Sequence, residues 1–262
     1  MQNPHPVLPA EILLLIARLL GPLDLIHLAR AIPGMDRDYK PKYWTTVKDE
    51  AGDTMFHIAS VNGWDDIIES LLTKNFDFSI QNSRGYTALH YACESDQYNT
   101  ASLLLDAGLS PNILAKNGMA ALHSAIAKGN TSIVRLLLGN GADMSVVTTG
   151  GYSMLHWAMQ TQQIDIIDLL VTNGADFTKG DISGRTPLHW AAADGNMQAV
   201  ELLLRAGADA TSIDHDGYTP ADLANQHKLS VARRIESVRQ RRSPSIAIHA
   251  LSSIMRWVSA WV

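Results

Sequence analysis

A six-residue segment recurs along this chain at a fixed interval, and this periodicity constrains the fold more than any other feature. Successive copies lie 33 residues apart, and they begin at Thr54, Thr87, Ala120, Ser153, Thr186 and Thr219. A period in the range of about 20 to 50 residues indicates repeated supersecondary units. One such unit cannot cover its own apolar face, so neighbouring units must stack. The sequence therefore predicts a pile of repeated modules.

Each copy carries the signals of a turn followed by a short helix. A glycine stands two residues before every copy, at Gly52, Gly85, Gly118, Gly151, Gly184 and Gly217. Glycine tolerates the positive φ of a tight turn. The Thr or Ser that opens most copies can cap a helix, and Pro187 and Pro220 suit a first helical position. A small residue closes each copy, as expected where helices approach closely: Ala59, Ala92, Ala125, Ala158, Ala191 and Ala224.

A second helix follows in each unit, for example over residues 133–138 and 200–204. Glycines at 141, 174 and 207 then supply a left-handed helix end. The segment Thr186-Pro-Leu-His189-Trp-Ala191 has the signature of the ankyrin repeat, and residues 48–237 resemble that family. The resemblance implies an all-α ankyrin-repeat solenoid of six helix-turn-helix repeats with turn tips. The expected repeats span 48–81, 82–114, 115–147, 148–180, 181–213 and 214–237.

Several departures from the repeat pattern predict local weakness. Ala120 lacks a capping hydroxyl. Asp96 and Gln162 replace the glycine that follows the first helix in other units, and Asn75-Phe-Asp replaces Gly-Ala-Asp. We expect the first, second and fourth repeats to be weaker than the third and fifth. The last second helix, residues 229–242, is rich in polar residues, as the end of a stack requires.

The first 47 residues have a different pattern. Helical apolar spacing follows Leu8-Pro9-Ala-Glu-Ile12, and a Gly-Pro break precedes a Leu-Asp-Leu step. This segment resembles a fungal-type F-box, which implies docking on a Skp-type linker protein and thereby on a cullin ubiquitin ligase. The resemblance implies six docking residues: Leu8, Pro9, Ile12, Ile16, Leu23 and Leu28. The alternative is a plain N-terminal cap that covers the first repeat.

The chemistry-bearing residues favour a structural role. Histidine recurs at 57, 90, 123, 156 and 189, but stacked helices hold successive copies about 10 Å apart, whereas zinc binds its ligands at about 2.1 Å. In ankyrin repeats this histidine ties neighbouring turns together. The one cysteine, Cys93, stands close to Glu94 and Asp96, which would raise its pKa. No catalytic motif is present, so we expect a non-enzymatic chain with no cofactor and no metal.

The variable turn tips are the better candidates for function. Tyr and Arg dominate binding hot spots, and ankyrin proteins commonly bind through tips and the adjoining concave helix face. The expected target-binding residues are Arg84, Tyr86, Lys116, Met119, Tyr152, Arg185 and Tyr218. A tyrosine there can also pack only against its own turn. We expect Trp157 and Trp190 to pack between repeats.

Charge and composition narrow the partners and the compartment. A net charge of −5 argues against nucleic acid, and a single cysteine fits cytosol or nucleus. No secretion signal or transmembrane segment is evident, so a membrane is not expected as a partner of the repeats. The tail, residues 238–262, is basic and amphipathic, and we expect it to fold back on the last repeat. Disorder, partner binding or membrane contact are its alternatives.

Two functions follow from this organisation. The first is a monomeric substrate-recognition adaptor of a cullin-type ubiquitin ligase, in which the N-terminal helices dock on the ligase and the repeats hold an unknown target. The second is a free-standing ankyrin scaffold or inhibitor whose N-terminus only caps the stack. Nothing in the sequence identifies the target, because specificity is spread over exposed tips.

Overall fold

The computed structural model describes residues 24, 47–72, 77–224 and 229–242. The candidate ligase-docking residues lie outside this range, as does Asn75 of the first repeat. The tail beyond residue 242 lies outside it as well, and so does its expected fold-back. Every regular element within the described ranges is a helix.

The chain divides into two compact units of about three repeats each, residues 1–146 and 147–262, and the boundary falls at the start of the fourth repeat. The first unit contains α5 (Met55–Asn62), α6 (Asp65–Leu72), α7 (Ala88–Glu94), α8 (Tyr98–Asp106), α9 (Ala121–Lys128) and α10 (Thr131–Gly139). The second contains α11 (Met154–Thr161), α12 (Ile164–Thr172), α13 (Pro187–Asp194), α14 (Met197–Ala206), α15 (Pro220–Leu223) and α16 (Leu229–Arg242). These helix pairs confirm the predicted ankyrin-repeat solenoid fold.

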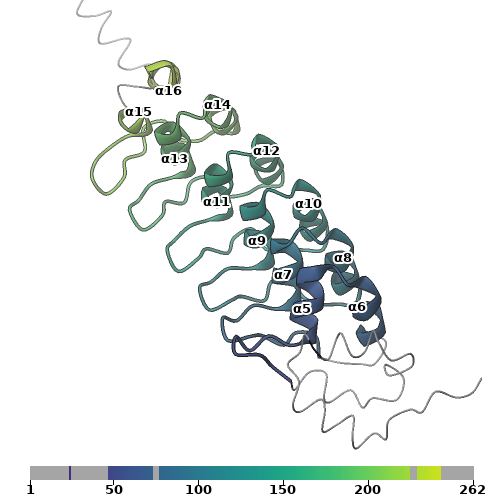
Figure 1. Ribbon diagram of the computed structural model, residues 1–262. Helices are drawn as coiled ribbons and strands as arrows, with labels where there is room; N and C mark the ends of the chain where they lie inside the picture. The colour runs from purple at the N-terminus through teal and green to yellow at the C-terminus, as the bar shows by residue number, and fades with distance from the viewer. Residues whose placement is uncertain (1–23, 25–46, 73–76, 225–228, 243–262) are drawn as a thin grey trace, which may run out of the picture. The chain divides into compact units, whose positions relative to one another are not determined.

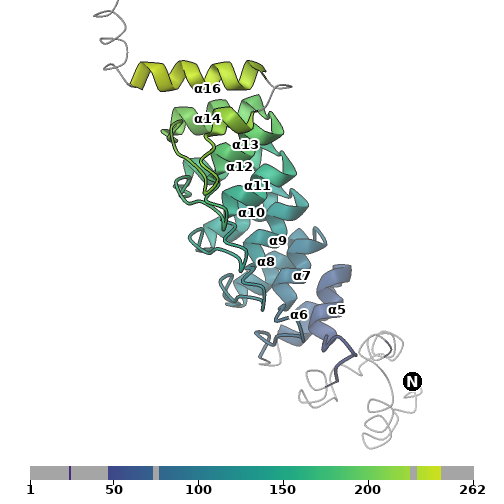
Figure 2. The same ribbon diagram turned by 90° about the vertical axis from the view of Figure 1, so that its left-hand side faces the viewer.

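Within each unit the helices form two rows (Figures 1 and 2). In the first unit, α7 packs between α5 and α9, and α8 contacts α6 and α10. In the second unit, α13 contacts α11 and α15, while α14 contacts α12 and α16. The loops that connect one repeat to the next project as tips beside the row of first helices (Figure 1).

The core is periodic because the repeat is periodic. The six alanines that close the recurring segments are all buried, which lets first helices approach closely. A leucine of the second helix is buried at the same 33-residue spacing in the first five repeats: Leu71, Leu104, Leu137, Leu170 and Leu203. Burying one leucine side chain contributes about 1.5 to 3 kcal/mol. Each of these five repeats therefore adds a similar increment of apolar burial.

The backbone confirms the predicted turn and cap positions. Gly129 and Gly195 end their first helices with φ of 78° and 73°. Asp96 and Gln162 occupy the equivalent positions and also take positive φ, 61° and 55°. Most residues with a Cβ are strained in this region by about 1 to 2 kcal/mol, and the short polar side chain of aspartate tolerates it better than glutamine does. The register of the repeat imposes this conformation, and the strain falls on the second and fourth repeats, where the glycine is replaced.

The final helix covers the end of the second unit. Val231 and Ile235 of α16 are buried, while the remaining described side chains of this helix stay at least partly accessible. The Arg234 guanidinium donates from Nε and Nη2 to the Glu201 carboxylate on α14, at 2.6 and 3.0 Å. This bidentate pair fixes the orientation of α16 on α14. The structure thus confirms the predicted capping helix.

Candidate protein-binding surface

Each tip is a tight turn closed by backbone hydrogen bonds, which side-chain bonds reinforce in several of the tips. In the second repeat, the Asn82 N–H donates to the Tyr86 carbonyl and the Gly85 N–H donates to the Asn82 carbonyl, at 3.0 and 2.9 Å. The Asn82 Oδ1 accepts from the N–H groups of Arg84 and Tyr86, both at 2.9 Å. In the fifth and sixth tips, the carboxylates of Asp181 and Asp214 accept the equivalent pair of backbone N–H bonds. The side chains of the tips are thereby presented from a defined backbone.

Backbone bonds also link one tip to the next. The Lys116 N–H donates to the Arg84 carbonyl at 3.0 Å in the first unit. The His215 N–H donates to the Ser183 carbonyl at 2.9 Å in the second unit. Neighbouring tips within a unit are therefore held side by side.

The recurring histidines join a helix start to the following tip. The His57 Nδ1 accepts the Thr54 N–H at 3.1 Å, so its proton resides on Nε2, which donates to the Tyr86 carbonyl at 2.9 Å. The same ring bonds repeat at later sites, from His90 to the Met119 carbonyl, from His156 to that of Arg185 and from His189 to that of Tyr218. These four contacts confirm that the histidine ties repeats together.

Burial keeps these rings neutral. Loss of solvent lowers the pKa of His90 and of His123 to about 4, and it also lowers the pKa of His57, His156 and His189. A neutral ring is the form that can accept at Nδ1 and donate at Nε2. The His123 Nδ1 accepts the Ala120 N–H at 3.0 Å. The third repeat therefore keeps the bond between the histidine ring and the helix start although it lacks a capping hydroxyl.

An aromatic and cationic cluster orients the tip of the second repeat. The Tyr86 ring stacks on His90 with a centroid separation of 5.2 Å, and the Arg84 guanidinium lies 4.8 Å from the Tyr86 centroid. Arg84 Nη2 donates to the Tyr91 hydroxyl at 2.7 Å, which in turn donates to Asp53 Oδ2 at 3.0 Å. Arg84 is nevertheless exposed. Its head group is therefore held in place while it remains accessible to a partner.

A second cluster lies between the fourth, fifth and sixth repeats. Trp190 Nε1 donates to Asp181 Oδ2 at 3.0 Å, and the Trp190 ring meets Tyr152 edge to face at 5.5 Å. Arg185 Nε donates to Asp214 Oδ2 in the next repeat at 3.1 Å. Trp190 thus packs between repeats as predicted. Part of the Tyr152 and Arg185 side chains is therefore used in contacts within the unit and is not open to a partner.

The predicted target-binding residues fall into two groups by exposure. Arg84, Lys116 and Tyr218 are exposed, whereas Tyr86, Met119, Tyr152 and Arg185 are half-buried. All seven lie on tips, three of them in the second unit and the others in the first.

Sequence reasoning missed two exposed apolar side chains at the tips. Ile182 and Ile213 of the second unit are 68% and 64% accessible. Leu114 and Val147 occupy the same repeat position as Ile213 and are also exposed. For Ile213, the available signal was an apolar residue that recurs immediately before the first residue of the turn; Ile182 lies at a different position, directly after Asp181.

The described residues supply little other chemistry. No cluster of three or more His, Cys, Asp or Glu side chains suited to a metal occurs among them. Cys93 is fully buried, and burial raises the pKa of its thiol. The predicted direction was right, but the expected cause, the neighbouring acidic residues, was wrong. None of the described helices combines the length and the apolar character that crossing a membrane requires.

The tips, the bridging histidines and the paired helices define a repeat protein of the class that binds other macromolecules through an extended surface. Family comparison matches ankyrin repeats (three copies) over residues 23–115 and 107–181, and a single ankyrin repeat over 183–215. The chain belongs to the ankyrin-repeat family. Its family matches include no F-box, and the first begins at residue 23, inside the segment 1–47.

A solved structure gives a particular neighbour. The ankyrin repeat domain of Bcl-3, a member of the IkappaB protein family, is 28% identical, with a TM-score of 0.66. The similarity covers 72% of this chain and 86% of that one. No curated protein matches the chain.

Proposed function

We propose that this chain is a non-enzymatic adaptor that holds a target protein on its repeat tips and the adjoining helix face. The observation that carries the proposal is the fixed presentation of exposed side chains: Arg84 is accessible although its guanidinium is bonded to Tyr91 and lies over Tyr86. Side chains ordered before binding lose less conformational entropy when a partner arrives. Tyr and Arg are also the residue types most enriched in binding hot spots.

In the second unit, apolar side chains supply the anchors. Ile182, Ile213 and Tyr218 all lie on tips, and each has more than half of its surface accessible. A partner that covers an exposed isoleucine stabilises the complex, because apolar burial contributes about 25 cal/mol per Å². These three residues are therefore expected to carry a large share of target affinity in this unit.

Affinity purification from a native extract with quantitative mass spectrometry tests the tip surface. The double variant Ile182→Asp/Ile213→Asp should lose the targets that the wild-type chain retains, because a partner would have to bury two carboxylates. Leu229→Asp is the matched control, since Leu229 is also an exposed apolar residue but lies at the start of α16. Circular dichroism checks that both variants are folded. Equal target recovery from the tip variant and the control would contradict the proposal.

The finer proposal is that residues 1–47 dock on a Skp-type linker protein, which makes the chain the substrate-recognition subunit of a cullin ubiquitin ligase in cytosol or nucleus. It rests on the sequence pattern from Leu8 to Leu28. Co-purification with a Skp-type protein tests it, and Leu23→Asp/Leu28→Asp should abolish that co-purification while tip-bound targets remain. Equal recovery of the linker with the variant would refute the docking surface.

The alternative is a free-standing scaffold or inhibitor, which the ankyrin-repeat family membership supports on its own. Under this alternative, deletion of residues 1–45 lowers stability and leaves all partner interactions intact. Under the adaptor proposal, the same deletion removes ligase components and retains the targets. One purification of the deletion variant therefore separates the two functions.

A further inference from the structure

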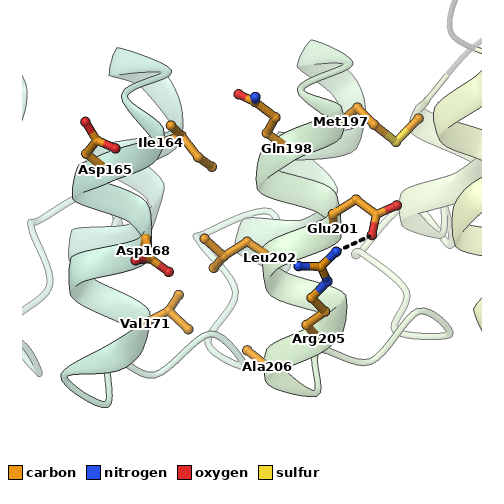
Figure 3. A pocket seen from close by; sticks show the side chains of 10 residues that line it. All are labelled: Ile164, Asp165, Asp168, Val171, Met197, Gln198, Glu201, Leu202, Arg205 and Ala206. Carbon is orange, nitrogen blue, oxygen red and sulfur yellow. Dashed lines mark ion pairs between the residues drawn. The ribbon is translucent and has the colours of Figure 1, made fainter.

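A groove runs between the second helices of the fourth and fifth repeats, on elements that the tip surface does not use. It has a volume of about 700 Å³ and is lined only by α12 and α14. Figure 3 shows Leu202 projecting from α14 toward α12, with Ile164 and Val171 on the opposite wall. These side chains are half-buried within the unit. The floor of the groove is therefore apolar and still partly open to solvent.

The walls of this groove carry an excess of negative charge. Asp165 and Asp168 are exposed on α12, and neither forms an ion pair within the part of the chain that the structure describes. On α14, the Glu201 carboxylate is already paired with Arg234 at 2.6 Å and lies 3.9 Å from Arg205. The unpaired carboxylates are thus gathered on the α12 wall. Positively charged groups of a ligand would be attracted to the α12 wall.

The corresponding groove in the first unit differs in chemistry. It lies between α8 and α10 and is lined by Asp96, Tyr98, Asn130, Ser132, Arg135 and Leu136. One carboxylate and one guanidinium balance there, and polar side chains occupy much of the lining. The α12–α14 groove is therefore a particular feature of its repeats and does not follow from helix stacking alone.

The dimensions of the α12–α14 groove suit a short helix. Ile164 and Val171 are seven residues apart on α12, which corresponds to a rise of about 10 Å, or two helical turns. An amphipathic helix binds such a groove through apolar residues at i, i+3, i+4 and i+7. We propose that the α12–α14 groove binds a cationic amphipathic helix of a partner protein, with its apolar stripe on Leu202 and its Lys or Arg residues facing Asp165 and Asp168.

Fluorescence anisotropy with the full chain tests this proposal. The probe is a labelled peptide of about 14 residues with Leu at i, i+3, i+4 and i+7 and Lys beside the stripe. The variant Asp165→Lys/Asp168→Lys should raise the Kd about tenfold or more, because two attractive contacts become repulsive. The same peptide with Glu in place of Lys should reverse this preference. Glu69→Lys/Asp106→Lys, the same charge change at exposed positions on α6 and α8, should bind as wild type.

Hydrogen exchange locates the bound peptide. Saturating peptide should protect α12 and α14, and Leu202→Glu should remove that protection. Equal Kd values for the two charge-reversal variants would overturn the proposal, as would peptide protection outside these helices. Protection of α12 and α14 that grows with protein concentration alone would place a second copy of the chain in the groove and would also overturn it.

Discussion

The buried histidines make the stability of this protein depend on pH, and His90 permits a quantitative prediction. Its pKa is about 4 in the folded chain against the ordinary value of 6.5, and burial is the largest cause. The folded state therefore favours the neutral ring, and its full contribution is present above about pH 6.5. Stability falls as the pH drops from there toward 4, because the unfolded chain then binds a proton that the folded chain excludes.

The magnitude follows from the two pKa values. At pH 5 the unfolded histidine is almost fully protonated and the folded one is mostly neutral, which costs about 2 kcal/mol of folding free energy relative to pH 7.5. His123 is lowered to a similar pKa and adds its own loss. We expect the variant His90→Gln to be less stable than wild type at pH 7.5 and to lose about 2 kcal/mol less than wild type on going to pH 5.

Urea unfolding at the two pH values, followed by circular dichroism and by hydrogen exchange in α7, measures this difference. His215→Gln is the matched control, because the His215 side chain is exposed on a tip. The control should retain the wild-type pH dependence. If His90→Gln loses as much stability between pH 7.5 and pH 5 as wild type does, the ring is not a buried neutral bridge and the reasoning fails.

Backbone and cap substitutions give the remaining predictions. Gln162→Gly should raise the free energy of unfolding of the second unit by about 1 kcal/mol, since it relieves a left-handed residue with a Cβ, whereas Gly195→Ala should lower it by a similar amount. Urea denaturation measures both, and a destabilising Gln162→Gly would show that the position is not strained. Ala120→Ser should stabilise the first unit by about 0.5 to 1 kcal/mol by restoring a hydroxyl beside His123 Nδ1. A melting temperature unchanged from wild type would contradict that expectation.

Much of the fold could be predicted because the repeat fixes the register of each residue. The glycine positions, the buried alanines and the bridging histidines all follow from the 33-residue spacing. Asp96 and Gln162 show how strong this constraint is, since their positive φ was implied only by the glycines at equivalent positions. Local propensity would have argued against it at Gln162, whereas aspartate enters this region more readily.

The candidate binding surfaces were less predictable, because accessibility depends on how neighbouring repeats cover each side chain. Arg185 was expected at a free tip, yet its guanidinium also pairs with Asp214, 29 residues later. Ile182 and Ile213 read as ordinary apolar residues in the sequence and are open to solvent in the structure. The α12–α14 groove combines residues from two helices, and no single segment of sequence contains it.

At four of the recurring histidines, the ring bond reaches the main chain of the following tip and does not involve the side chain there. Tyrosine, methionine and arginine all occupy the accepting position, at Tyr86, Met119 and Arg185, with ring-to-carbonyl distances of 2.8 to 3.1 Å. Substitution at such a site therefore leaves the histidine bond itself in place, although a side chain that also contacts the next repeat, as Arg185 does with Asp214, adds to the joint between repeats. The histidine bond thus places no requirement on the side chain at these three positions, and this part of the joint tolerates variation in the tip residues.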